Sequence, residues 1–146
     1  MKDTIEKCEM IKNEGIKLKI NSVITKLNCK EDMSWLIEKV KPCRWKVFQV
    51  LEIKERNSYS IQELLISKDE FGVFVKKHEN FKVVSENNNE MIESYVMIDP
   101  NGRFYQNTGH TYIFSASIIN VGLNRSLKEI NYNHAKFIDK GGFYKW

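Results

Sequence analysis

The chain has 146 residues, of which 42% are hydrophobic and 29% charged, and this suits one compact domain rather than a collagen-like or disordered protein. The net charge of +4 permits a polyanionic ligand but is too weak to indicate a nucleic-acid partner. No apolar run is long enough for a membrane span. We therefore expect a protein with no nucleic-acid partner and no membrane segment.

The three cysteines, Cys8, Cys29 and Cys43, lie far apart in the sequence. Their odd number and wide spacing favour reduced thiols over a disulfide framework or a zinc ribbon. The first residues, MKDTIEKCEM, lack the apolar segment of a signal peptide. These features predict a cytoplasmic protein.

The three histidines, His78, His110 and His134, have no metal-ligand partner three or four residues away on a helix. We expect each of them to be a surface residue. The sequence also contains no phosphate-binding P-loop, no G-x-G-x-x-G and no G-x-S-x-G motif.

The first third of the chain alternates helical and strand patterns. Helical spacing predicts helices from Asp3 or Thr4 to Gly15 and over Glu31–Val40, and alternation predicts strands over Lys17–Val23 and Arg44–Ile53. A strand, a helix and a strand in this order form a βαβ unit with parallel strands. Two parallel strands alone are not a stable sheet, so we expect part of a larger barrel or sheet.

The rest of the chain has a mixed α+β pattern. Ser67 and Glu70 have the spacing of a capping box, which predicts a helix to His78. Further predictions are a short strand over Phe81–Ser85, a β-hairpin of Tyr95–Ile98 and Arg103–Gln106, a helix over Ser117–Ile130, and a last helix capped by Asn133.

Basic and polar residues recur at alternate positions of the two predicted parallel strands. Lys19 and Asn21 share one face of the first strand, and Arg44 and Lys46 share one face of the second. The interior near strand ends is where (β/α) barrels hold their chemistry, and two inward lysines need an anion such as a triphosphate. The alternative is a solvated strand face. Trp45 is expected on the opposite face, packed against a helix.

Two other features have a structural and a functional interpretation. Tyr95 carries no chemical signature of its own, and a buried tyrosine often does no more than hydrogen-bond a neighbour. Gly141 and Gly142 follow a short predicted helix. Their N–H groups could form a small anion-binding nest, or the two glycines could simply end the helix.

Four segments together resemble viperin and its prokaryotic homologues, which are radical S-adenosylmethionine enzymes of antiviral defence. The segments are KINSVITKLN, KPCRWKVFQVLEI, SYVMIDPNGRF and KFIDKGGFYKW, in the order of the family. The resemblance implies an α/β fold, namely the C-terminal portion of a partial (β/α)6 barrel with a mixed α+β C-terminal extension. Residues 1–56 would be the back part of the barrel, and residues 57–146 the remaining helix and the extension.

The family enzyme converts a nucleoside triphosphate, CTP or a related one, to its 3′-deoxy-3′,4′-didehydro form. A 4Fe-4S cluster cleaves S-adenosylmethionine, and the resulting radical takes a hydrogen from the ribose. By resemblance, Lys19 and Lys46 match the lysines that hold the triphosphate, and Arg44 matches a basic residue beside them. Asn21 shares their face and is included among the expected substrate-binding residues. Tyr95 matches the tyrosine proposed to return a hydrogen to the product radical.

The resemblance also assigns residues to the cofactor and to closure of the site. Val50 and Leu51 match the stretch that lies against the adenine of S-adenosylmethionine. Gly141 and Gly142 resemble the segment that closes over the phosphates. We therefore expect both glycines to contact the substrate.

One essential motif of the family is missing from this sequence. The cluster motif Cys-x3-Cys-x2-Cys is absent from this sequence, and the three distant cysteines cannot replace it. We expect the chain to be inactive alone. Three origins stay open: part of a longer viperin-like enzyme, one part of a split enzyme whose partner is a separate N-terminal barrel half, or the product of a disrupted gene. The alternatives are a non-catalytic module that binds a nucleoside triphosphate, or an inert fragment.

Overall fold

The structure, a computed structural model, describes residues 2–54 and 56–143. The helices are α1 (Lys2–Asn13), α2 (Ser34–Val40), α3 (Ser58–Ile61), α4 (Lys68–Lys77), α5 (Asn88–Met91), α6 (Ile118–Val121), α7 (Leu123–Lys128) and α8 (His134–Asp139), with 3-10 turns η1 (Gln62–Leu64) and η2 (Glu79–Phe81). The strands are β1 (Lys19–Ile24), β2 (Arg44–Gln49), β3 (Val84–Glu86), β4 (Met97–Ile98), β5 (Arg103–Asn107) and β6 (Tyr112–Ser117).

The first sheet is parallel and has the strand order β1-β2-β3. The connection from β1 to β2 contains α2, and the connection from β2 to β3 contains α4. The predicted parallel βαβ unit is therefore confirmed. The third strand comes from the part of the chain after residue 57, so the first sheet draws on both predicted segments, and the division at residues 56 and 57 stays a prediction.

One face of the first sheet is largely apolar because basic and apolar side chains alternate over the first four residues of β2, from Arg44 to Val47. Trp45 and Val47 are almost fully buried. The Trp45 ring contacts Phe74 and His78 at centroid distances of 6.3 and 5.3 Å, so α4 covers this face, and the expectation for Trp45 is confirmed. Burial of a large apolar side chain stabilises a fold by about 1.5–3 kcal/mol, so this face is the main core.

The helix α4 begins with the predicted capping box. The Ser67 hydroxyl accepts from the Glu70 N–H at 3.0 Å, and the Glu70 carboxylate accepts from the Ser67 N–H at 2.8 Å. These two bonds satisfy N–H groups that have no partner within the helix.

The expectation that His78 lies at the surface is wrong, whereas His110 and His134 are exposed as expected. His78 is fully buried. Its Nε2 accepts from the Met33 N–H at 3.0 Å, and its Nδ1 donates to the Phe74 carbonyl at 2.8 Å. These bonds join α4 to the start of α2, so His78 has a structural role.

The start of the second helix differs from the prediction, because the helix begins at Ser34 rather than Glu31. The Asp32 carboxylate accepts from the Ser34 N–H at 2.9 Å, a local side-chain bond that competes with helix formation before Ser34. The preceding turn is stabilised by Asn28, whose amide accepts from the Thr25 N–H at 2.8 Å and donates to the Val23 carbonyl at 3.1 Å.

The second sheet is antiparallel, with the order β4-β5-β6. The predicted hairpin is confirmed, and the Gly102 N–H closes its turn on the Asp99 carbonyl at 3.0 Å. The strand β6 was not predicted. The expected helix over Ser117–Ile130 is two short helices, because Gly122 has a φ of +81° and separates α6 from α7.

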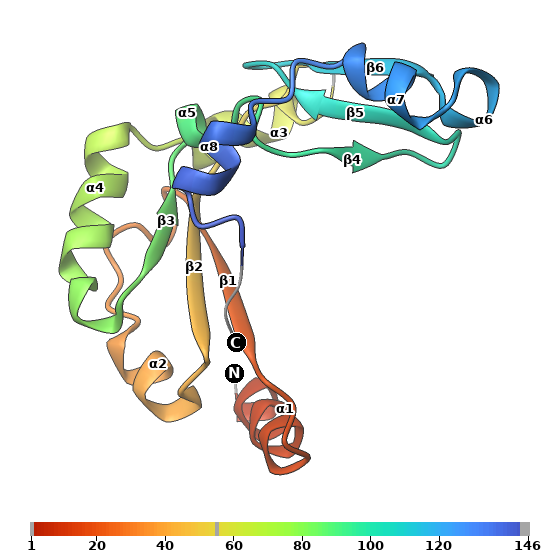
Figure 1. The fold of residues 1–146 in the computed structure, drawn as a ribbon. Coiled ribbons are helices and arrows are strands. Elements are labelled where there is room, and N and C mark those ends of the chain that lie inside the picture. The colour runs from red at the N-terminus through yellow and green to blue at the C-terminus, as the bar shows by residue number, and fades with distance from the viewer. Residues whose placement is uncertain (1, 55, 144–146) are drawn as a thin grey trace.

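Figure 1 shows how the two sheets are arranged: the second sheet, with α6 and α7, projects from the end of the first sheet where β1 and β2 finish. The chain then returns, and α8 lies beside the end of β2 and β3. The fold is thus mixed α/β with one parallel and one antiparallel sheet. Among the described residues, no helix has the length and apolar character that crossing a membrane requires.

Candidate functional site

The polar face of the first sheet gathers the four predicted strand residues. In the parallel register Lys19 lies opposite Arg44, and Asn21 lies opposite Lys46. All four therefore occupy the face opposite Trp45. Asn21 is exposed, Lys19 and Arg44 are partly buried, and the Lys46 side chain is only 4% exposed.

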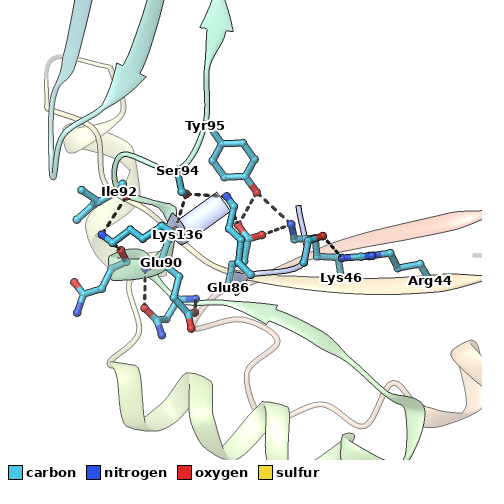
Figure 2. Close-up of polar contacts among 12 residues, drawn as sticks. Arg44, Lys46, Glu86, Glu90, Ile92, Ser94, Tyr95 and Lys136 are labelled. Carbon is cyan, nitrogen blue, oxygen red and sulfur yellow. Dashed lines mark hydrogen bonds and ion pairs between the residues drawn. The ribbon is translucent and has the colours of Figure 1, made fainter. Parts of the chain in front are cut away.

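Lys46 is shielded because a group of polar side chains closes over it. We call this group the Glu86 cluster: Lys46, Glu86, Ser94, Tyr95 and Lys140. Its members come from β2, β3, the segment before β4, and the end of α8. Figure 2 shows Lys46, Glu86, Ser94 and Tyr95 turned toward one another.

Glu86 lies at the centre of the cluster and is fully buried. Its carboxylate forms ion pairs with the ammonium groups of Lys46 and Lys140. It also accepts a hydrogen bond from the Tyr95 hydroxyl at 2.5 Å, and the same hydroxyl accepts from Lys46 Nζ at 3.3 Å. Tyr95 thus has the hydrogen-bond partners expected of a buried tyrosine, and one of them is a predicted substrate-binding lysine.

Lys140 supplies the second positive charge of the cluster. Its Nζ lies 3.3 Å from the Glu86 carboxylate, 2.7 Å from the Ser94 hydroxyl and 3.1 Å from the centroid of the Tyr95 ring. Burial lowers the pKa of Lys140 to about 8, and the nearby Glu86 carboxylate opposes this change. The Lys46 ammonium adds to the lowering by repulsion.

The end of α8 also reaches the polar face of the first sheet. Arg44 Nη2 donates to the Gly141 carbonyl at 3.0 Å. The N–H groups of Gly141 and Gly142 donate to the carbonyls of Ile138 and Phe137, as expected where a helix ends. The two glycines are therefore held beside Arg44, and their contact with a substrate stays a prediction.

Val50 and Leu51 lie apart from the Glu86 cluster. They follow the last residue of β2, and Val50 is buried in the apolar core with Ile24 and Val47. Leu51 is partly exposed, and its carbonyl accepts from the Asn57 side chain at 3.1 Å. Their contact with S-adenosylmethionine stays a prediction.

Two central members of the cluster were missed by sequence reasoning. Glu86 comes directly after the predicted strand Phe81–Ser85, and the observed strand β3 includes it. A charged residue at the end of an apolar strand pattern is the one signal that could have drawn attention to it. Lys140 precedes Gly141 in a chain rich in lysine, so nothing in its local pattern separates it from surface lysines.

The described residues do not provide a site for an iron–sulfur cluster. No group of three or more His, Cys, Asp or Glu side chains within residues 2–54 and 56–143 is arranged to hold a metal ion. Cys8 and Cys29 are separately buried and Cys43 is exposed. These thiols do not fit a 4Fe-4S cluster.

Several known proteins are similar in sequence to this chain. No protein-family model matches it. A protein of Flammeovirga pacifica named S-adenosylmethionine-dependent nucleotide dehydratase is 45% identical over 133 residues, which are 90% of this chain and 46% of that protein. A protein of Lacinutrix mariniflava with this name is 42% identical over 99% of this chain and 30% of that protein. An S-adenosylmethionine-dependent nucleotide dehydratase of Danio rerio is 34% identical over 90% of this chain and 38% of that protein.

This chain is a homologue of the S-adenosylmethionine-dependent nucleotide dehydratases. It spans less than half the length of each of these three dehydratases. The match to the Lacinutrix mariniflava dehydratase covers 99% of the chain, so the similarity extends over both sheets and is not confined to one motif. The resemblance to the viperin-like dehydratases is confirmed.

Proposed function

We propose that this chain is the substrate-holding part of a viperin-like, S-adenosylmethionine-dependent nucleotide dehydratase. In this proposal the first sheet belongs to a partial (β/α)6 barrel, and residues 57–146 contribute the extension that closes the site. The complete enzyme converts a nucleoside triphosphate, CTP or a related one, to its 3′-deoxy-3′,4′-didehydro form in antiviral defence. The names of the relatives support the cofactor and the class of reaction.

One observation carries the proposal: the predicted basic residues lie on one face of two parallel strands, and Tyr95 contacts one of them. A triphosphate is a multiply charged anion, and Lys19 and Arg44 would offer charge-assisted hydrogen bonds to its oxygens. Lys46 is buried in its ion pair with Glu86 and would add positive charge to this face. The exposed Asn21 amide adds a neutral donor on the same face. In this arrangement Tyr95, whose hydroxyl is held by Lys46 and Glu86, would lie beside the substrate.

S-adenosylmethionine, when bound with a reduced cluster, would supply the radical that starts the reaction on the ribose. The described residues hold no cluster site, and in this proposal the ligands come from an N-terminal barrel half. The first sheet supports this partner, because β1 is an edge strand with β2 as its neighbour. An open edge of this kind is a template for pairing with a further strand.

Reconstitution tests this function. The chain is co-expressed with the cluster-binding portion of the Flammeovirga pacifica relative and loaded with iron and sulfide without oxygen. It is then supplied with dithionite as the reductant, S-adenosylmethionine and CTP. We expect a product with the mass of CTP less one water. Lys46→Gln should abolish it, while Lys39→Gln, which removes an exposed lysine of α2, should not. Absence of product from a correctly loaded complex that binds CTP would contradict the dehydratase function.

The second candidate is a non-catalytic module that binds nucleoside triphosphates. An inert fragment, which binds no nucleotide, is the remaining alternative. The observation behind the binding module is the same strand face, on which Lys19 and Asn21 lie opposite Arg44 and Lys46. The module predicts CTP binding by the chain alone and no product in the reconstituted mixture. An inert fragment would neither bind CTP nor form product.

A further inference from the structure

Glu86 ends the short strand β3 and is fully buried, although a buried carboxylate is costly without partners. Its side chain lies on the same face of the sheet as Lys46, because Lys46 pairs with Val84 and Phe48 pairs with Glu86 in the parallel register. The carboxylate is retained there by two ammonium groups and one phenol. No apolar packing explains a carboxylate at this position.

The contacts of Glu86 join the two residues to which the proposed function gives different tasks. One carboxylate oxygen pairs with the Lys46 ammonium, and the other accepts the Tyr95 hydroxyl proton at 2.5 Å. Since Lys46 donates to the Tyr95 oxygen at 3.3 Å, the three groups form a closed triangle. In this triangle the Tyr95 proton can point in only one direction.

We infer that Glu86 is a positioning residue, which fixes the Tyr95 hydroxyl and the Lys46 ammonium relative to each other. The inference rests on the proposed function for the tasks of Lys46 and Tyr95, but the positioning itself concerns only residues of this chain. Glu86 itself would not contact the substrate. It acts through its two neighbours, so its loss should alter both together.

Lys140 explains why the charge of Glu86 matters as well as its shape. The cluster holds two ammonium groups that repel each other, and the Glu86 carboxylate lies between them as the shared counter-charge. Glu86→Gln keeps the size of the side chain and an acceptor oxygen but removes this charge. The two ammonium groups then lose their common partner, and Lys46 is no longer held against Tyr95.

The first arm of the test needs no substrate. Side-chain carboxyl carbons are labelled with 13C-glutamate, and the Glu86 resonance is identified by its loss in Glu86→Gln. We expect this resonance to move in both Tyr95→Phe and Lys46→Gln, and to stay in place in the control Lys39→Gln. A Glu86 resonance that neither substitution moves would overturn the inference. This arm works with the intact carboxylate, so it remains decisive even where Glu86→Gln fails to fold.

The second arm is a double-mutant cycle on CTP binding by calorimetry. We expect Lys46→Gln to weaken CTP binding by about tenfold or more in the parent chain but by less than about threefold when Glu86→Gln is present, because contacting residues are not additive. With Glu9→Gln, an exposed carboxylate of α1, the effect of Lys46→Gln should stay at its full size. Equal effects of Lys46→Gln in all three backgrounds would overturn the coupling. A parent chain that does not bind CTP would instead contradict the proposed function, and the first arm alone would then decide the inference.

Discussion

Arg44, the first residue of β2, donates a hydrogen bond at 3.0 Å to the carbonyl of Gly141, which lies 97 residues later in the chain. The neighbouring Lys140 pairs with Glu86 on β3. Two cationic contacts therefore hold the end of α8 against the first sheet. The segment expected to close the site is thus docked by the same face that carries the candidate triphosphate-binding residues.

The close packing of Gly142 against Phe137 of α8 predicts that Gly142→Ala destabilises the protein. A Cβ atom at this position would lie 2.4 Å from the Phe137 carbonyl oxygen and 2.5 Å from atoms of the Phe137 ring, so the end of α8 must shift. We expect a loss of about 1–3 kcal/mol in the free energy of unfolding, as for other overpacked sites. Urea denaturation followed by tryptophan fluorescence measures it.

Gly72→Ala is the matched control for this substitution. Gly72 lies inside α4, and a Cβ there meets no atom within 4 Å. Because alanine is the better helix former, we expect it to stabilise the chain by up to about 1 kcal/mol. If Gly142→Ala were as well tolerated as Gly72→Ala, the described end of α8 would be wrong.

The lowered pKa of Lys140 predicts a change of stability with pH. Below about pH 8 Lys140 is protonated in the folded and the unfolded chain, and the cost of burying its charge is fully present. Between about 8 and the ordinary value of 10.5, only the unfolded chain keeps the proton, so unfolding takes up a proton. The contribution of Lys140 to the free energy of unfolding therefore rises with pH over this range.

The measurement compares the parent chain with Lys140→Met from pH 7 to pH 10. Subtracting the two free energies of unfolding removes the titration of the other lysines. We expect the difference, parent minus variant, to increase with pH. A difference that stays flat or falls would mean that burial does not lower the pKa of Lys140.

The open edge of the first sheet predicts self-association of the chain when no partner covers it. Val23 on β1 is 53% exposed, and β1 is an edge strand of the described sheet. A lysine on an edge strand opposes pairing with another copy. We therefore expect Val23→Lys to shift the chain toward monomer in sedimentation velocity. Val73→Lys, an exposed position on α4, should leave association unchanged, and equal behaviour of the two variants would contradict this role for β1.

The sequence predicted local structure well where one strong signal determined it. The capping box of Ser67 and Glu70, the turn at Asp99 and Gly102, and the parallel pairing around Trp45 are all set by residues close together in the chain or by simple alternation. Prediction failed where two signals competed. The strand β6 ends at Ser117, where helical spacing also begins, and neither pattern is long enough to mark the boundary.

Strand alternation predicted only the part of the candidate site that lies on β1 and β2. Alternation places Lys19, Asn21, Arg44 and Lys46 on one face, and the register agrees. The burial of Lys46 depends on Glu86 and on the return of α8, and contacts between segments so distant leave no trace in local spacing. The Glu86 cluster is therefore a product of tertiary packing.

Calorimetric titration of the chain with CTP, CDP and cytidine tests whether the polar face of the first sheet binds the phosphates of a nucleotide. We expect the affinity to fall with each phosphate removed, because the charges of Lys19, Arg44 and Lys46 act on the phosphates. We also expect Lys46→Gln to weaken CTP binding and Lys39→Gln to leave it unchanged. Equal affinity for CTP and cytidine, or CTP binding unaffected by Lys46→Gln in a folded chain, would contradict phosphate binding by this face.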